Sequence, residues 1–156
     1  MASVDLLRGG LLVMLLAISP LPSAWAQAAS ATPSTTAPML SPDAAVDGAL
    51  QVAALVDAGR AGELWDGASP VVKRVVARAV FIDGLAASRK PKGAVAGREW
   101  RVVRRQRHDG TQGVPAGHYV SVELLARLAS GEQMRELVSL RLDEDGVARF
   151  SGYVVE

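Results

Sequence analysis

The sequence contains no cysteine, few aromatic residues and almost no net charge. Its 156 residues include 4% Phe, Trp and Tyr, and the formal net charge at pH 7 is +1. The absence of thiols excludes disulfides, thiolate metal ligands and a cysteine nucleophile. The low charge and the scarcity of aromatic rings disfavour a nucleic-acid partner, because such proteins present basic surfaces and rings that stack on bases.

The sequence also lacks an apolar run long enough to cross a membrane. Arg8 precedes a short apolar run, Leu11 to Ile18, which is well below the roughly 20 residues that a spanning helix needs. Two prolines and the small-x-small segment Ala24-Trp25-Ala26 follow. This order is typical of a secretory signal peptide. It predicts cleavage between Ala26 and Gln27, no membrane span, and a periplasmic or secreted mature protein.

The rest of the chain divides into a linker and one domain. Ala, Ser, Thr and Pro dominate residues 27–40 without apolar periodicity, a composition that is typical of disordered tethers. The remaining length suffices for one hydrophobic core. We therefore predict a signal peptide over residues 1–26, a disordered linker over 27–41 and a single α+β domain over 42–156.

Helix signals come first in this domain. Ser41-Pro42-Asp43 has the form of an N-cap, a proline at the first helical position and an acid in the first turn. The apolar spacing that follows predicts a helix that ends at Gly59. A short amphipathic stretch surrounds Leu64. Ser69-Pro70 repeats the start signal, and the apolar stripe after it predicts one continuous second helix to about Ala87.

Strand signals occupy the second half of the chain. After Gly97, β-branched and other apolar residues alternate with polar ones, as in strands. Asp145-Gly146 is a hairpin turn signal. The segment Val122–Ser130 is also compatible with a helix. The predicted strands are one around 100–103, then Tyr119–Leu128, Met134–Leu142 and Val147–Val155. Helices followed by antiparallel strands indicate the α+β class.

Four segments of the sequence resemble a known family. They are Leu55–Ser69, Ser88–Arg98, Gly117–Val120 and Asp145–Val155. In order and spacing they are similar to the exported bacterial family called domain of unknown function 4019, which resembles the nuclear transport factor 2-like (cystatin-like) superfamily. The resemblance covers about residues 46–155. It implies a cone in which N-terminal helices pack on a bent antiparallel sheet. In that superfamily the cavity at the open end binds a small apolar ligand, holds a catalytic site or is filled by side chains.

Basic residues gather in the first predicted strand. Eight of the chain's 17 Lys and Arg lie between residues 89 and 107, where Glu99 is the single acid. Strict alternation would place Arg101, Val103, Arg105 and Arg107 on one face of a strand, and Trp100, Val102 and Arg104 on the other. Two interpretations stay open. The arginines pair across the sheet with acids such as Glu123, Glu132 and Glu136, or Arg101, Arg105 and Arg107 bind an exported anionic lipid or glycan.

Other candidate site residues are few. Trp65, Phe81 and Tyr119 are the aromatic residues that we predict to line a ligand pocket, with a role as core anchors as the alternative. His108, Asp109 and His118 bracket a glycine-rich loop, but ordinary turn chemistry explains them, and we predict no metal and no cofactor. We assign no catalytic residue, because the acids Asp57, Asp66 and Asp143 to Asp145 sit at helix ends and turns.

These observations lead to one predicted function and two alternatives. The prediction is an exported, non-catalytic binding or accessory protein that holds a small apolar ligand or an unknown protein partner. The alternatives are a cavity enzyme of the isomerase or hydratase kind, and an envelope-surface binder of anionic lipid or glycan through Arg98 to Arg107. A homodimer through an exposed sheet face that carries Val103, Tyr153 and Val155 is a further hypothesis.

Overall fold

The helices precede the strands in the computed structural model, which describes residues 40–111 and 113–156. The predicted signal peptide, its cleavage site and the linker up to residue 39 lie outside the described residues. Within the described part, no helix is long and apolar enough to cross a membrane. The helical elements are α1 (Pro42–Asp57), α2 (Ala61–Asp66), α3 (Pro70–Val75), α4 (Arg78–Arg89) and the 3₁₀ turn η1 (Lys90–Lys92).

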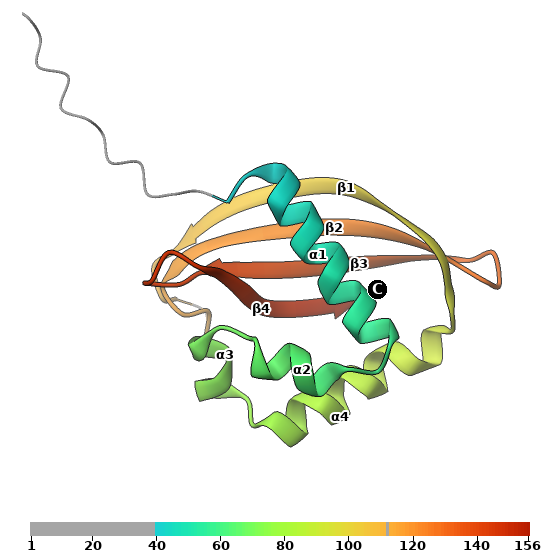
Figure 1. Ribbon diagram of the computed structural model, residues 1–156, viewed down its shortest axis with the longest axis horizontal. Coiled ribbons are helices and arrows are strands. Elements are labelled where there is room, and N and C mark those ends of the chain that lie inside the picture. Colours follow the sequence, from blue (N-terminus) through green and yellow to red (C-terminus); the bar gives the residue numbers. More distant parts are fainter. Residues whose placement is uncertain (1–39, 112) are drawn as a thin grey trace, which may run out of the picture. The chain divides into compact units, whose positions relative to one another are not determined.

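The strands form one antiparallel sheet that bends around the first helix (Figure 1). Their order in space follows the chain, and α1 packs on the first three strands while α3 contacts the last. The α+β prediction is confirmed, with helices first and antiparallel strands after them. The strands are β1 (Val95–His108), β2 (Gly117–Leu128), β3 (Gln133–Leu142) and β4 (Ala148–Val155).

Both predicted ends of the first helix are confirmed. The Ser41 side chain accepts a hydrogen bond from the Ala44 N–H, and Pro42 occupies the first turn. At the other end, Gly59 has a φ of 68°, and the N–H groups of Gly59 and Arg60 bond back to carbonyls of the last turn. This left-handed termination favours glycine. Leu40 and Ser41, which we assigned to the linker, therefore already contact the domain, Leu40 by packing on the core.

The prediction of one continuous second helix is wrong. The chain leaves α3 at Val76, which is extended, and re-enters helix α4 at Arg78. The Val76 carbonyl accepts a hydrogen bond from the Trp65 indole N–H at 3.1 Å. Two β-branched residues in succession, Val75 and Val76, also weaken the helix at this point. The predicted apolar stripe is only partly confirmed: Val72 is buried and Ile82 is half-buried, whereas Val75 and Ala79 are exposed because the break changes the direction of the helix.

The core lies between α1 and the sheet. On the sheet side it consists of alternating residues of β2 and β3, with Val122, Leu124 and Val138 fully buried. The buried side of α1 carries alanines at positions 45, 49 and 53, which allow a close approach of helix to sheet. Since β2 includes Val122 to Leu128 in regular alternation, the helical alternative for that segment is wrong. Long-range pairing on both sides of β2 overrides its local helix propensity.

The faces predicted for the arginine-rich strand need a correction. Trp100 pairs with Leu124 whereas Val102 pairs with Glu123, so Arg101 is an extra residue in a β-bulge. Because neighbouring residues of β2 point to opposite faces, Trp100 and Val102 do not share a face. The predicted alternation holds only from Val102 onward. A bulge adds one residue to a strand, and nothing in the sequence marks its position.

The proposed dimer face is also corrected. Val103, Tyr153 and Val155 pair with Val122, Val138 and Glu136, all of which are fully buried. Paired residues share a face, so the three side chains lie on the helix-covered face of the sheet. Alternation in the sequence separates two faces, but it does not tell which of them the helices cover.

Strand β1 is a long edge strand in the described part of the sheet. Such an edge presents unpaired backbone groups to other chains, and proteins protect it with charged side chains and bulges. Strand β1 has both, since Arg101, Arg104, Arg105 and Arg107 are exposed along it and Arg101 forms the bulge. We interpret the arginine run as protection of this edge against strand pairing between molecules.

We predict that Arg104→Val combined with Arg107→Val increases aggregation, because the change leaves an apolar edge strand open to pairing. The measurement is light scattering over time at fixed protein concentration. Arg74→Val combined with Lys92→Val is the control, since it removes the same charge from exposed positions outside the sheet. Equal aggregation rates of the two double variants would contradict the interpretation.

Candidate functional site

A glutamate is fully buried on the helix-covered face of the sheet. Glu136 of β3 accepts hydrogen bonds from the Arg98 guanidinium, with Nε to Oε2 at 2.5 Å and Nη2 to Oε1 at 3.0 Å. The Tyr153 hydroxyl of β4 donates to Oε1 at 2.6 Å. A buried carboxylate needs such compensation, because an unpaired charge in the interior is very costly.

Arg98 extends this pairing to the helices. Its Nη1 donates to Asp57 Oδ2 at 2.7 Å, and the other oxygen of Asp57 accepts from Arg89 Nη2 at 2.7 Å. Arg89 Nη1 donates to the Gly93 carbonyl at 2.7 Å. Asp57 ends α1 and Arg89 ends α4, so one connected set of charges joins both helices to the sheet. We call Asp57, Arg89, Arg98, Glu136 and Tyr153 the buried charge network; Glu136 and Arg89 are buried, Arg98 and Tyr153 are half-buried, and Asp57 lies at its solvent edge with 29% of its side chain exposed.

The network lowers the pKa of Asp57 and raises the pKa of Tyr153. Burial by itself raises the pKa of Asp57, but the hydrogen bonds and positive charges of Arg98 and Arg89 outweigh it and hold that pKa below its ordinary value. Burial, followed by the bond to the Glu136 carboxylate, raises the pKa of Tyr153 well above its ordinary value. Tyr153 therefore remains a hydrogen-bond donor to Glu136.

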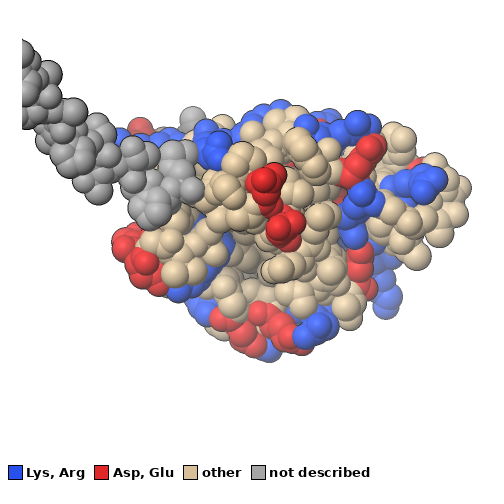
Figure 2. All heavy atoms as spheres, turned by 45° about the horizontal axis from the view of Figure 1, so that its top comes forward, with Lys and Arg blue, Asp and Glu red and all other residues tan. Residues whose placement is uncertain are grey.

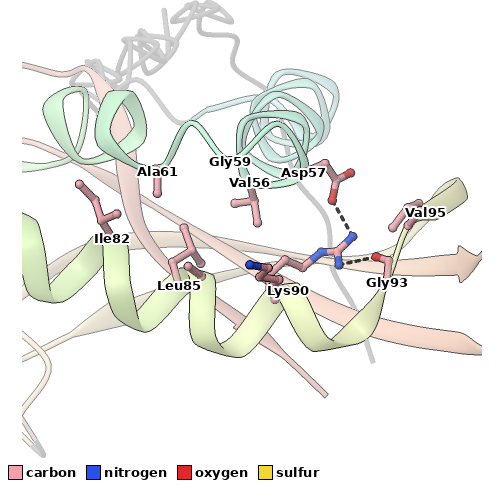
Figure 3. A pocket seen from close by; sticks show the side chains of 12 residues that line it. Val56, Asp57, Gly59, Ala61, Ile82, Leu85, Lys90, Gly93 and Val95 are labelled. Atoms are coloured by element: carbon pink, nitrogen blue, oxygen red, sulfur yellow. Dashed lines mark hydrogen bonds and ion pairs between the residues drawn. The ribbon is translucent and has the colours of Figure 1, made fainter.

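A cavity of about 500 Å³ lies beside this network (Figure 3). It lies between α1, α2, α4 and the start of β1 and is open to solvent on one side, where Asp57, Ala86 and Lys90 are exposed. Its walls are mainly aliphatic. Its polar end is formed by Asp57 and Arg89 of the network and by Lys90, the residue after Arg89. The lining residues are Val56, Asp57, Gly59, Ala61, Ile82, Leu85, Ala86, Arg89, Lys90, Gly93, Ala94 and Val95. Volumes of about 300–1,000 Å³ with apolar walls and few polar groups are typical of small-molecule sites.

The polar groups at the end of this cavity differ in how many hydrogen-bond and ion-pair partners they have. One oxygen of Asp57 accepts from Arg89 (Figure 3), and the other accepts from Arg98. Arg89 is largely buried, and its Nε has no hydrogen-bond partner among the described residues. Lys90 has no ion-pair or hydrogen-bond partner in the part of the chain that the structure describes. The end of the cavity therefore has an excess of positive charge.

The three aromatic residues predicted to line a pocket are not brought together. Trp65 bonds to Val76 in the connection between α3 and α4, with Lys73 over its ring. Phe81 packs edge-on against Phe150 in the core, with 5.7 Å between ring centroids. Tyr119 lies on the sheet face away from Val120 and donates its hydroxyl to the Pro115 carbonyl. None of the three lines the cavity beside the network.

The arginines predicted to bind anions are exposed along β1 but do not form one cluster of unbonded side chains. Arg101 forms an ion pair with Glu99 at 2.9 Å, and Arg105 donates to the Leu40 carbonyl at 2.9 Å. Arg107 lines a different hollow at the far end of the sheet, together with His118 and Arg141. Of the acids predicted as partners, Glu123 pairs with Arg104 and Glu136 with Arg98. On the described part of the face in Figure 2, charges of both signs are interspersed.

The histidines belong to that far hollow and do not form a metal centre. His108 packs edge-on against Tyr119, with 5.3 Å between ring centroids, and Asp109 accepts hydrogen bonds from Thr111. Within residues 40–111 and 113–156, no group of three His, Cys, Asp or Glu side chains is placed to hold a metal ion. Two acids of the hollow, Asp143 and Glu144, pair with Arg141 at 2.6 and 2.7 Å.

The fold and the site define a small α+β domain whose cavity is closed at one end by a buried charge network. The chain belongs to the family described as Protein of unknown function (DUF4019), whose profile matches residues 48–153. No curated protein and no solved structure matches it. Three of the four segments that carry the resemblance converge here: they contribute Asp57, the pair Arg89 and Arg98, and Tyr153. The segments are far apart in the sequence, and the network brings residues of all three together.

Sequence reasoning missed the central acid of the network. Glu136 was expected to be a surface partner of an arginine, and Asp57 a residue of a helix end. The one signal was positional: Glu136 occupies an even-numbered position of β3, in phase with the apolar Met134 and Val138. An acid in phase with core residues indicates a buried, paired carboxylate.

We predict that Glu136→Gln lowers the free energy of unfolding by about 3 kcal/mol, because it leaves the Arg98 guanidinium partly unpaired in the interior. Urea unfolding of both proteins at pH 7 measures the difference. Glu63→Gln is the control, since Glu63 pairs with Arg60 in an exposed ion pair, and it should change stability far less. If both variants had the same small effect, the network would not be a major source of stability.

Proposed function

We propose that this protein is an exported, non-catalytic binding domain of the nuclear transport factor 2-like cone type, which holds a small ligand in the cavity beside the buried charge network. The observation that carries the proposal is the cavity itself. Aliphatic side chains from three helices and one strand line it, and charged groups are confined to one end. This arrangement resembles small-molecule sites in general, where apolar walls supply affinity and a few polar groups supply orientation.

The bent antiparallel sheet and the preceding helices support the assignment to the cone-shaped superfamily. Support for export comes from the pattern of the first 26 residues, in which a basic residue, a short apolar run and a small-x-small site follow one another. A periplasmic or secreted location then follows for the mature chain.

The state of the acids favours binding over catalysis. An isomerase or hydratase requires a carboxylate that faces the substrate and can take up a proton. Glu136 is fully buried and accepts three hydrogen bonds, and Asp57 is held by two guanidinium groups. Both carboxylates are thereby committed to structural pairing, and neither offers a free oxygen to a substrate in the cavity.

The dispersion of the arginines likewise weighs against the envelope-surface alternative. Binding to an anionic surface requires several cationic side chains that can reach it together. Arg98 is buried in the network, Arg101 is paired with Glu99, and Arg107 lies at the far end of the sheet. The cavity is therefore the better-supported site.

We expect native mass spectrometry of the protein, purified from its own cell envelope, to show an additional small-molecule mass that is lost under denaturing conditions. Ala86→Trp should abolish this additional mass, because Ala86 lines the cavity and a tryptophan there occupies its space. Ala87→Trp is the matched control, since Ala87 is exposed on the same helix and is not a lining residue.

The same denatured spectra report the N-terminus, and the proposal expects a mature chain that begins at Gln27. A bare mass for the wild-type protein under gentle conditions would contradict ligand binding. It would favour a cavity filled by side chains and a protein partner instead.

A further inference from the structure

The charges around the cavity do not cancel. Within the buried charge network, two carboxylates face two guanidinium groups at 2.5–3.0 Å. Lys90 is the next residue after Arg89 and also lines the cavity. Lys90 is exposed and no described acid pairs with it, so its ammonium adds one positive charge at the solvent-facing polar end of a cavity whose remaining walls are mainly aliphatic. The carbonyls of the last turn of α1, which carry partial negative charge, are engaged by the N–H groups of Gly59 and Arg60.

We propose that the cavity recognises a small amphipathic carboxylate, a ligand with an aliphatic body and one anionic head. This inference rests on the proposed binding function and specifies its ligand class. The aliphatic body packs against Val56, Ile82 and Leu85, and the carboxylate lies at the end formed by Arg89 and Lys90. A carboxylate there pairs with the Lys90 ammonium and is attracted by the positive charge of the neighbouring Arg89 guanidinium, whose unbonded Nε is itself too buried to donate to a ligand.

The same charges discriminate against other ligand classes. A cation meets Lys90 and Arg89, and the carboxylate nearest to it, Asp57, has both oxygens already bonded. A neutral ligand of the same shape gains the apolar contacts but leaves the ammonium without a counter-charge. A strongly polar anion such as free phosphate gains the charge interaction with Lys90. It makes no apolar contact with the aliphatic walls, and it would lose hydration there without compensation. A carboxylate with an aliphatic chain satisfies both parts of the cavity.

Calorimetric titration of the full chain at pH 7 with three matched probes, octanoate, octanamide and octylammonium, tests the ligand class. We expect octanoate to bind about tenfold more tightly than octanamide, as one charge-assisted pair supplies, and octylammonium to bind most weakly. Lys90→Met should weaken octanoate binding by about tenfold and leave octanamide binding unchanged. Lys92→Met is the matched control, because Lys92 lies in the same 3₁₀ turn and does not line the cavity.

Two sets of results would overturn the inference, and they can be told apart. Equal binding of octanoate and octanamide, both abolished by Ala86→Trp and both unaffected by Lys90→Met, would mean that the cavity binds neutral apolar ligands. The proposed binding function would then stand, but the preference for an anionic ligand would be overturned. The same conclusion would follow if octylammonium bound best. Failure of all three probes to bind, or binding that Ala86→Trp does not reduce, would overturn the inference and count against the proposed function as well.

Discussion

The Arg98 guanidinium joins two carboxylates that come from opposite layers of the domain. Glu136 lies in the sheet and Asp57 ends the first helix, and both accept short hydrogen bonds from this one side chain. Burying an arginine and a glutamate costs several kcal/mol per ion, so the pairing must be nearly complete to be tolerated. It is complete only when β1, β3 and the end of α1 are correctly placed. The interaction therefore specifies one arrangement of helices over the sheet.

The cavity depends on that arrangement. Asp57 also holds Arg89, which fixes the end of α4 opposite the end of α1. The space between these two helix ends and the start of β1 is not closed by large side chains, because alanines and glycines contribute much of its lining. The charge network thus supports one end of the cavity, and Lys90 follows directly from the residue that the network holds. The proposed ligand site therefore depends on side chains that also hold the helices to the sheet.

Much of the fold could be predicted from local signals, whereas the site could not. Ser41 and Gly59 mark the ends of α1 because caps act within a few residues, and Asp145-Gly146 marks the last hairpin for the same reason. The break at Val76 depends on a bond from Trp65, and the bulge at Arg101 depends on the partner strand. The network depends on residues up to 96 positions apart, from Asp57 to Tyr153. Such pairing leaves no local pattern in the sequence except that Glu136, an acid, occupies a strand position in phase with apolar core residues.

A double-mutant cycle between Asp57→Asn and Glu136→Gln tests most directly whether the network acts as one unit. The two carboxylates do not touch each other in the described structure, and they are linked only through Arg98. If Arg98 couples them, the effects on the free energy of unfolding will be non-additive by at least about 0.5 kcal/mol. If the two effects add within error, the helix end and the sheet are stabilised independently, and the central role assigned to Arg98 is contradicted.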